Sequence, residues 1–595
     1  MADSSVRVGV WPVALVWVLT AAGYAARSIA NAATTPLLLD TDDAMRLTEV
    51  RDFLHGQNWF DIVQHRLNTP YGAEMHWSRL IDLPEATILF LLRPFLGPLA
   101  ETVTAYVWPL LLLAPLLWLT ARIAVRLGGR LALWPALLLT PFGIIALTEF
   151  VPGRLDHHSA QLLCTLVMMY CAIAALDRPR FALGAGIAAG VALAIGIEGL
   201  PLVGMTVTIF ALMWVAGDKR EALRDFGLSF GLSMALALAQ GVPPWRWFEL
   251  RLDAISIVYA GAAVLCAIAF LTLSLLPLRS WIARLAAAVV AAIAVVAILL
   301  ALDPAILKGP YAALDPWLVQ NWLSHIAEAE SWLQSMRGDP VYPLAVTIPV
   351  LIGLATAIWN AVRLRADRGA WLVAIAFLVM GLAVMLIQIR AARLVTPLAI
   401  PACATLIAAL WQHFRDTRRV LPAIGIFVTS LASAGIVIAA IVTFAEPDDP
   451  ANATLGNAPP ANGAAVSRDP CLLPAAFTDL AGLPPERIMA PIDLGSHILA
   501  YTPHAVVGAP YHRNQQGLLD TFHFFNEPIA EARTILDARG ISLVVICPSM
   551  REIRGLVDHA PDSFISLFAA NQLPAWLVDR SLPGAALKLY SVSPR

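Results

Sequence analysis

The sequence predicts a polytopic α-helical membrane protein of about thirteen transmembrane helices, followed by a C-terminal α/β domain. Of its 595 residues, 59% are hydrophobic and 14% are charged, and the mean hydropathy is +0.71. Soluble domains carry about 25% charged residues. Long apolar stretches recur as far as residue 444, and the pattern then changes. The net charge of −2 and the lack of a basic run give no indication of nucleic-acid binding.

Apolar stretches close to the roughly 20 residues that a bilayer requires define the membrane part. They lie at 10–30, 103–121, 131–149, 159–176, 181–199, 202–216, 226–242, 256–277, 286–302, 343–362, 370–388, 394–411 and 421–444. The first stretch is not followed by a small-residue cleavage site, so we expect it to remain as the first span.

Basic residues in alternate short loops predict the orientation. These residues are Arg122, Arg126, Arg130, Arg178, Arg180, Lys219, Arg220, Arg224, Arg279, Arg284, Arg363, Arg365, Arg368, Arg415, Arg418 and Arg419. Loops rich in Lys and Arg lie in the cytoplasm. The opposite loops, including 31–102, 150–158 and 303–342, are then external, and an odd number of spans places the tail on their side.

The domain boundaries follow from composition. Residues 1–445 form the membrane domain, and residues 446–470, rich in Pro, Ala, Asn and Gly, read as a linker. In the domain 471–595 we expect strands at 487–492, 505–509, 541–547 and 586–592, and a helix at 517–539. Cys471 and Cys547 could form a disulfide if this domain lies in an oxidising compartment.

Three carboxylates open the first external loop. Asp40, Asp42 and Asp43 precede apolar residues at helical spacing, and Gly56 can end that helix. One interpretation is that one Asp caps the helix and water solvates the others. The alternative is a site for a hard divalent cation, which prefers several carboxylate oxygens.

The short second external loop concentrates ionisable groups beside two spans. It holds Arg154, Asp156, His157 and His158. Ionisable groups at a membrane boundary usually face a cavity or a partner. They form either an interfacial Arg154–Asp156 pair with histidines that reach to the interface, or a metal site with Asp156 and one imidazole, compatible with Mg²⁺ or Mn²⁺.

The long loop 303–342 and the start of a late span supply further candidates. The loop could be an amphipathic helix at the membrane interface, with Trp317, Trp322 and Trp332 in the aromatic belt. This interpretation explains Glu328 and Glu330 less well. Arg390 and Arg393 lie at the external end of a span. They are interfacial arginines or a clamp for phosphate oxygens.

Polar residues follow two predicted strands of the tail. Asp493 comes after the first, and His512 and Arg513 come after the second. The ends of neighbouring strands are where α/β domains place binding sites. Surface turns are the alternative interpretation, and these three residues are our candidates for binding an acceptor.

Together these motifs resemble the catalytic subunit of oligosaccharyltransferase, within the GT-C class of membrane glycosyltransferases. The shared layout is an acidic first loop, a short Arg-x-Asp-x-His loop and Ile-Ala-Glu in a long later loop. A late external Arg and an α/β tail with Asp-x-Gly follow. The resemblance implies a divalent metal, Mg or Mn, a polyprenyl-phosphate or -diphosphate-linked sugar donor, and an active site on the periplasmic side of a bacterial inner membrane.

The resemblance also implies roles for particular residues. The catalytic Asp falls on Asp42, with Asp40 and Asp43 as competing alignments. The metal motif falls on Asp156 and His158, where imidazole replaces a carboxylate. The loop glutamate of the family, which contacts the acceptor amide, falls on Glu328.

The donor-phosphate Arg falls on Arg390, with Arg393 as the alternative. The family's acceptor motif Trp-Trp-Asp-Tyr-Gly falls on Pro491-Ile492-Asp493-Leu494-Gly495, so only Asp493 and Gly495 remain. The acceptor is therefore expected to be another protein motif, a glycan or a lipid.

The sequence thus predicts an enzyme that transfers a sugar or oligosaccharide from a lipid-linked donor with help from a metal. A flippase for a lipid-linked substrate and a non-catalytic envelope assembly protein are the alternatives. A transporter is disfavoured because the chain shows no internal repeat and its charged candidates collect at one face.

Overall fold

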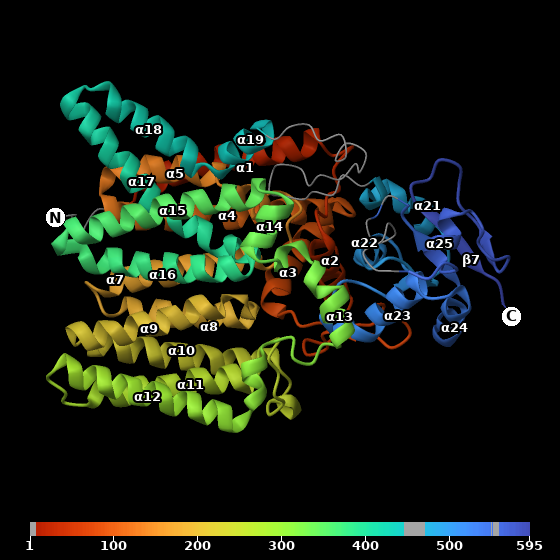
Figure 1. Cartoon of the computed structure of the whole chain (residues 1–595), viewed down its shortest axis with the longest axis horizontal. Helices are drawn as coiled ribbons and strands as arrows, with labels where there is room; N and C mark the ends of the chain where they lie inside the picture. Colours follow the sequence, from red (N-terminus) through yellow and green to blue (C-terminus); the bar gives the residue numbers. More distant parts are fainter. Residues whose placement is uncertain (1–7, 446–469, 549, 551–558, 595) are drawn as a thin grey trace.

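The computed structural model describes residues 8–445, 470–548, 550 and 559–594. A bundle of long helices forms one end of the molecule and a small sheet with flanking helices forms the other (Figure 1). The predicted linker 446–470 lies outside the described residues except for Pro470.

Ten helices in the described part are long and apolar enough to cross a membrane. They are α1 (Val10–Ala30), α4 (Leu99–Gly128), α7 (His158–Ala175), Ile197–Gly217 with α9 (Leu200–Gly217), α10 (Arg220–Gly241), α11 (Ile257–Leu275), α12 (Trp281–Leu302), α15 (Val341–Arg363), α16 (Arg368–Ile387) and Ile389–Thr417 with α17 (Ala392–Thr417). The pair α18 (Val420–Ser433) and α19 (Gly435–Ala445), bent by 82°, makes an eleventh if it counts as one span.

The two remaining predicted stretches are shorter apolar helices. They are Arg130–Phe142, which contains α5 (Leu133–Leu139), and α8 (Phe181–Ile195). All thirteen predicted stretches therefore fall on helical segments, and the prediction of a polytopic helical membrane protein is confirmed. Two of them fall below the length of a full span.

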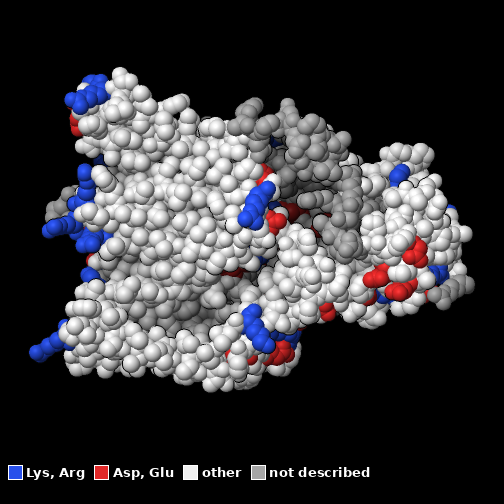
Figure 2. All heavy atoms as spheres, viewed as in Figure 1, with Lys and Arg blue, Asp and Glu red and all other residues white. Residues whose placement is uncertain are grey.

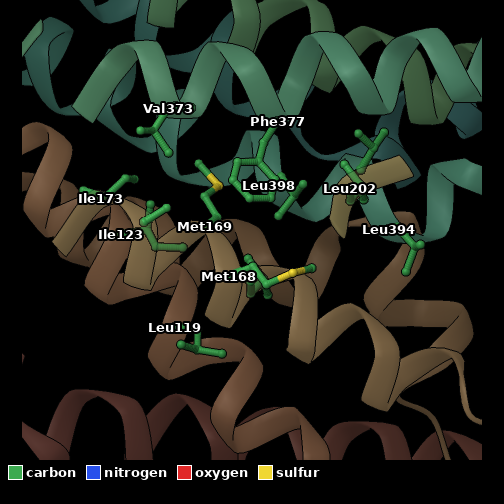
Figure 3. Packing of buried hydrophobic residues seen from close by; sticks show 14 of the residues in the cluster. Leu119, Ile123, Met168, Met169, Ile173, Leu202, Val373, Phe377, Leu394 and Leu398 are labelled. Carbon is green, nitrogen blue, oxygen red and sulfur yellow. The ribbon is translucent and has the colours of Figure 1, made fainter. Parts of the chain in front are cut away.

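The centre of the bundle is a close-packed apolar core. Met168 of α7, Phe377 of α16 and Leu398 of α17 are fully buried and meet there (Figure 3). On the other side of α7, small residues bring α8 and α10 together. A Cβ on Gly186 would come within 2.6 Å of the backbone oxygen of Phe226, so this contact requires glycine.

Basic side chains mark one end of the bundle. Figure 2 shows Lys and Arg gathered at the end of the helices that points away from the sheet. This is the distribution that the alternate basic loops of the sequence predict.

The C-terminal region is built on a five-stranded sheet in the order β4-β3-β5-β7-β6. Its strands are β3 (Arg487–Met489), β4 (Ala505–Val506), β5 (Leu543–Ile546), β6 (Leu577–Asp579) and β7 (Lys588–Val592). The first three in sheet order are parallel, and β7 pairs antiparallel with β5 and β6. The sequence missed β6, which is short and largely exposed.

The helices of this region differ from the expectation in two places. Residue Ile492, predicted to end a strand, begins helix α22 (Ile492–Tyr501). The helix predicted at 517–539 is two helices, α23 (Gln515–Asn526) and α24 (Ile529–Arg539). Pro528 separates them because proline cannot donate the backbone hydrogen bond of a helix interior.

The loop 31–102, which is the predicted first external loop, extends into this sheet region. Leu67 bridges Val506 of β4, and the Val506 amide donates to the carbonyl oxygen of Arg66 at 2.8 Å. The Arg66 guanidinium donates to the carbonyls of Leu499, Thr502 and His504, which lie at the C-terminal end of α22 and beyond. The tail is therefore held against the loop 31–102 by main-chain contacts and by the Arg66 side chain.

The loop 303–342 is not the single interfacial helix that its pattern allowed. It contains α13 (Pro316–Asn321) and α14 (Trp332–Gly338), joined by 3₁₀ turns. Trp317 packs edge-on against Phe522 of α23, with ring centroids 5.5 Å apart, and Trp322 is buried in the same cluster. These two tryptophans dock the loop on the tail instead of forming a membrane belt.

The fold makes a prediction about Cys471 and Cys547, which are joined by a disulfide that closes a loop of 76 residues in sequence separation. Closing such a loop restricts the unfolded chain, so Cys471→Ser is expected to lower the unfolding free energy of the tail by about 2–4 kcal/mol. Thermal unfolding of the full chain measures this. The matched control Cys164→Ser removes a free thiol and leaves the transition in place; equal transitions for both variants would contradict the prediction.

Candidate active site

Helix α2 (Thr41–Leu54) begins at the acidic stretch of the first external loop. The Asp40 carboxylate accepts the backbone amides of Asp42 and Asp43 at 3.0 Å each, and the Asp43 carboxylate accepts the amide of Asp40. This is a capping box, so capping by one Asp is confirmed. The expectation that water solvates the others is wrong for Asp43, which is fully buried.

Arg154 gathers the carboxylates around it. Its guanidinium donates to Asp40, to Asp43 at 3.0 Å and to Glu149 at 3.1 Å, and it lies 3.5 Å from Asp156. Burial opposes its charge, but the four carboxylates raise the pKa of Arg154 well above its ordinary value. The simple Arg154–Asp156 pair considered from the sequence is one edge of a larger network.

Two further hydrogen bonds fix Asp43 to the second loop. Its other carboxylate oxygen accepts the amides of Leu155 at 2.7 Å and Asp156 at 3.1 Å. The start of α2 and the second external loop are thus one unit, which brings the predicted first-loop and second-loop residues together.

Asp156, His157 and His158 form the tightest cluster of possible metal ligands. One ligand atom from each lies within 4.8 Å of the other two, and all three residues are largely buried. The Nδ1 atoms of both imidazoles approach the Asp156 carboxylate, at 2.6 Å for His157, without the angle of a hydrogen bond. Nitrogen and oxygen atoms that converge in this way fit a divalent cation.

His157 links this cluster to Glu198. Its Nε2 atom lies 3.7 Å from a carboxylate oxygen of Glu198, which also accepts a bond from Gln161 at 3.1 Å. Burial would lower the pKa of His157, but Asp156 and Glu198 raise it to about 10. The carboxylates therefore favour a positive charge at this position.

Asp42 lies beside the cluster but outside it. Burial and the neighbouring carboxylates of Asp156 and Asp40 raise the pKa of Asp42 well above its ordinary value. In the part of the chain that the structure describes, no Lys, Arg or His forms an ion pair with Asp42. The predicted metal set of Asp42, Asp156 and His158 is therefore assembled in part, with His157 in the place expected for Asp42.

Arg393 contacts the cluster, whereas Arg390 does not. Arg393 donates to the Nε2 atom of His158 at 2.6 Å and to Glu328, and it lies 3.2 Å from Glu149. Arg390, in the 3₁₀ turn Ile389–Ala391, donates to the Gln388 side chain. Since Arg cannot accept a bond, the neutral His158 ring carries its proton on Nδ1.

Two carboxylates of the site, Glu149 and Glu198, were missed in the sequence. Glu149 ends α6 (Ile144–Glu149), and Glu198 lies in the 3₁₀ turn Ile197–Gly199 between two apolar helices. A single carboxylate in or beside a long apolar stretch is unfavourable in free energy. The presence of such a carboxylate was the sequence signal that could have identified both residues.

The tail covers the first turn of α2. The Tyr511 hydroxyl donates to the carbonyl oxygen of Thr41 at 2.9 Å, and α22 packs along α2. Asp493 lies in the first turn of α22 with its side chain exposed.

His512 and Arg513 do not face an open surface. His512 lies 2.8 Å from Asp253, and Arg513 binds Asp253 at 2.6 Å and Glu74 at 3.2 Å. These two predicted acceptor residues thus join the tail to the loop before α11 and to the first external loop. The structure places them in an interface between segments.

The fold defined here is that of the GT-C membrane glycosyltransferases. Similar solved structures include those of the archaeal oligosaccharyltransferase from Archaeoglobus fulgidus. In complex with an inhibitory peptide and a dolichol-phosphate, it matches with a TM-score of 0.65 and 14% identity over 98% of this chain and 74% of that one. Tethered with an acceptor peptide containing the NVT sequon, it matches at 0.65 and 13% over 98% and 74%.

The complex of the same enzyme with Zn and sulfate matches with a TM-score of 0.60 and 14% identity over 97% of this chain and 73% of that one. No family model and no curated protein sequence matches this chain. The resemblance expected from the sequence is therefore confirmed for the fold. The reaction has to be inferred from the residues of the site.

The network makes a prediction about Arg154. Arg154→Gln would leave buried carboxylates without their shared cation, so we expect a loss of about 3–5 kcal/mol of stability. Arg224→Gln, which removes an exposed pair with Asp225, is the matched control and should cost about 0–1 kcal/mol. Thermal unfolding of the purified protein compares the two, and similar transition temperatures would overturn the role given to Arg154.

Proposed function

We propose that this protein is an integral membrane glycosyltransferase. It moves a sugar or oligosaccharide from a polyprenyl-phosphate or -diphosphate donor to an acceptor. The observation that carries the proposal is the gathering of carboxylates and imidazoles around Asp156. These groups come from separate segments and meet at one end of the helical bundle. The dolichol-phosphate in the archaeal relative with the same fold supports a lipid-linked donor.

The reaction is a displacement at the anomeric carbon. The acceptor nucleophile forms a bond to this carbon, the bond to the phosphate oxygen breaks, and the phosphate leaves with the electron pair. Asp42 accepts the proton of the nucleophile. Arg393 binds the phosphate oxygens, since its guanidinium already reaches the cluster through His158.

Asp156, His157 and His158 are the residues that would hold a divalent metal. When bound, the metal supplies positive charge that stabilises the leaving phosphate. Two imidazoles with one carboxylate favour Mn²⁺ over Mg²⁺, because Mg²⁺ prefers oxygen ligands alone. Binding of a metal at Nδ1 of His158 would require the ring proton on Nε2, so the bond from Arg393 would have to break, which would free the Arg393 guanidinium for phosphate oxygens.

The acceptor differs from an asparagine sequon. Of the family's acceptor motif only Asp493 and Gly495 are present, and His512 and Arg513 are occupied by Asp253. A site without groups for the sequon hydroxyl gains nothing from that hydroxyl. We therefore propose a different protein motif, a glycan or a lipid as acceptor, with Glu328 beside Arg393 to orient it.

The basic residues gather at one end of the bundle (Figure 2), and helix α2, which begins at the site, lies at the opposite end, beside the sheet region (Figure 1). Under the positive-inside rule this end is external, which for a bacterial inner membrane means periplasmic. The collection of charged groups at one end, away from the middle of the bundle, also disfavours a transporter.

The orientation is tested by reporter fusions. Alkaline phosphatase fused after residue 595 should be active, because it folds only outside the cytoplasm. The matched fusion after Lys219, in a basic loop, should be inactive. The reverse pattern of activities would place the site in the cytoplasm.

Transfer is tested with the purified full chain, a panel of radiolabelled polyprenyl-linked donors and a total membrane extract as acceptor source. We expect a labelled product whose formation stops with EDTA and resumes with Mn²⁺. Asp42→Asn should reduce transfer by about 10²–10⁴-fold, because it removes the base while keeping the side-chain shape. The control Asp52→Asn, on the same helix, should keep activity. Unchanged transfer in Asp42→Asn would reject the assignment.

A further inference from the structure

Glu149 lies between the two arginines of the site, Arg154 and Arg393. It is the last residue of α6, and its side chain is 4% exposed. Its Oε2 atom accepts a hydrogen bond from Arg154 at 3.1 Å, and its Oε1 atom lies 3.2 Å from the Nε atom of Arg393. Each carboxylate oxygen therefore serves a different guanidinium. The proposed transfer reaction gives Glu149 no direct part, so these contacts need another explanation.

The three nitrogen atoms of the Arg393 guanidinium have partners of different kinds. The Nε atom faces the buried carboxylate of Glu149. The Nη1 atom donates to the neutral ring of His158 at 2.6 Å, and the Nη2 atom donates to Glu328, whose side chain is 51% exposed. An exposed ion pair contributes little free energy, whereas a buried pair is strongly unfavourable to break. We therefore expect the contact at Nε to persist while the contacts at the two Nη atoms are exchanged for a ligand.

The two Nη atoms are the part of the guanidinium that suits a phosphate group. They form a fork that can bind two phosphate oxygens at once, provided that the fork points at the phosphate. A free Arg side chain has many rotamers, and ordering such a side chain during binding reduces the affinity. Glu149 holds Arg393 at the Nε atom, which leaves the fork directed toward His158 and Glu328.

The surroundings of Glu149 give it a fixed position. Its chain neighbours Thr148 and Phe150 are buried, so the end of α6 has little room to move. Its other partner, Arg154, binds Asp43 at 3.0 Å and lies 3.5 Å from Asp156. Through Arg154, the carboxylate of Glu149 therefore connects Arg393 to the residues that would hold a metal.

We propose that Glu149 is the positioning residue of Arg393 and directs its guanidinium at the phosphate group of a polyprenyl-phosphate ligand. The proposal rests on the glycosyltransferase function above and adds the group that orients the phosphate-binding arginine. The sign of the effect separates this role from simple electrostatics. A carboxylate repels a phosphate, so removal of the charge alone would strengthen phosphate binding. Loss of the position of Arg393 would weaken phosphate binding instead.

The test compares two ligands that differ only in the phosphate group. Calorimetric titration of the purified full chain in detergent gives its affinities for a polyprenyl phosphate and for the matching polyprenol. The ratio of the two affinities measures the phosphate contact. Glu149→Gln keeps the shape of the side chain but offers one acceptor oxygen to two arginines. We expect the ratio to fall about tenfold, which is the effect of losing one charge-assisted hydrogen bond.

A double-mutant cycle identifies the arginine through which Glu149 acts. Arg393→Gln should lower the ratio by itself, and Glu149→Gln should have no further effect in that background. The control Glu101→Gln makes the same change in the pair of Glu101 with Arg51, and its ratio should equal that of the unmodified protein. An unchanged or higher ratio in Glu149→Gln would overturn the proposal. A loss that persists in the Arg393→Gln background would also overturn it, because Glu149 would then act through Arg154.

The transfer assay on the same samples separates this role from the proposed function. If the titrations give the expected ratios but no donor is turned over, the proposed function fails and the role of Glu149 stands. If sugar is transferred but the ratio in Glu149→Gln is unchanged, the role of Glu149 fails alone. If the unmodified protein binds the phosphate and the alcohol equally, Arg393 is not a phosphate ligand and the role of Glu149 is rejected.

Discussion

The site depends on the ion pairs that the guanidinium of Arg154 makes. The guanidinium is buried, and it joins carboxylates from the start of α2, the end of α6 and the second external loop. A planar group with five donors can hold several carboxylates in fixed directions, whereas a Lys ammonium cannot. Arg154 binds both Asp43 and Asp156. It therefore sets the distance between the first turn of α2, which carries Asp43, and the cluster of Asp156 with the two histidines.

A second set of polar contacts fixes the tail to α2, to the loop before α11 and to the loop 31–102. Asp253 and Glu74 share Arg513, and the Tyr511 hydroxyl reaches the carbonyl of Thr41. Buried or half-buried ion pairs with several bonds give a defined orientation even where their net energy is small. The sheet region therefore lies against the start of α2, and Trp317 and Trp322 pack the loop 303–342 against the sheet region.

Much of the fold could be predicted because its signals are local. Apolar length marks the spans, and the place of Asp40, Asp42 and Asp43 before a helical pattern indicates that one of them is a cap, which the structure shows to be Asp40. The choice between Arg390 and Arg393 could not be read in this way. Both lie at the same end of one span, and only the 3₁₀ turn that precedes α17 directs Arg393 into the cluster. Likewise the partners of His512 and Arg513 come from a distant loop, and no periodicity reveals such a pairing.

The altered acceptor motif has a structural counterpart in the packing of α22. Ile492, at a position where the family carries a tryptophan, is buried with Leu318, Trp322, Leu518 and Phe522. This apolar cluster docks the loop 303–342 onto the tail, so the position serves packing between segments. A side chain enclosed in that way cannot also line a pocket for a hydroxyl. The segment that the resemblance aligns with the acceptor motif thus packs against the loop 303–342, and the same loop carries Glu328, which contacts Arg393. Under the proposed function, the carboxylates of Asp493 and Glu328 are our candidates for binding the acceptor, because each can accept hydrogen bonds from hydroxyl or amide donors.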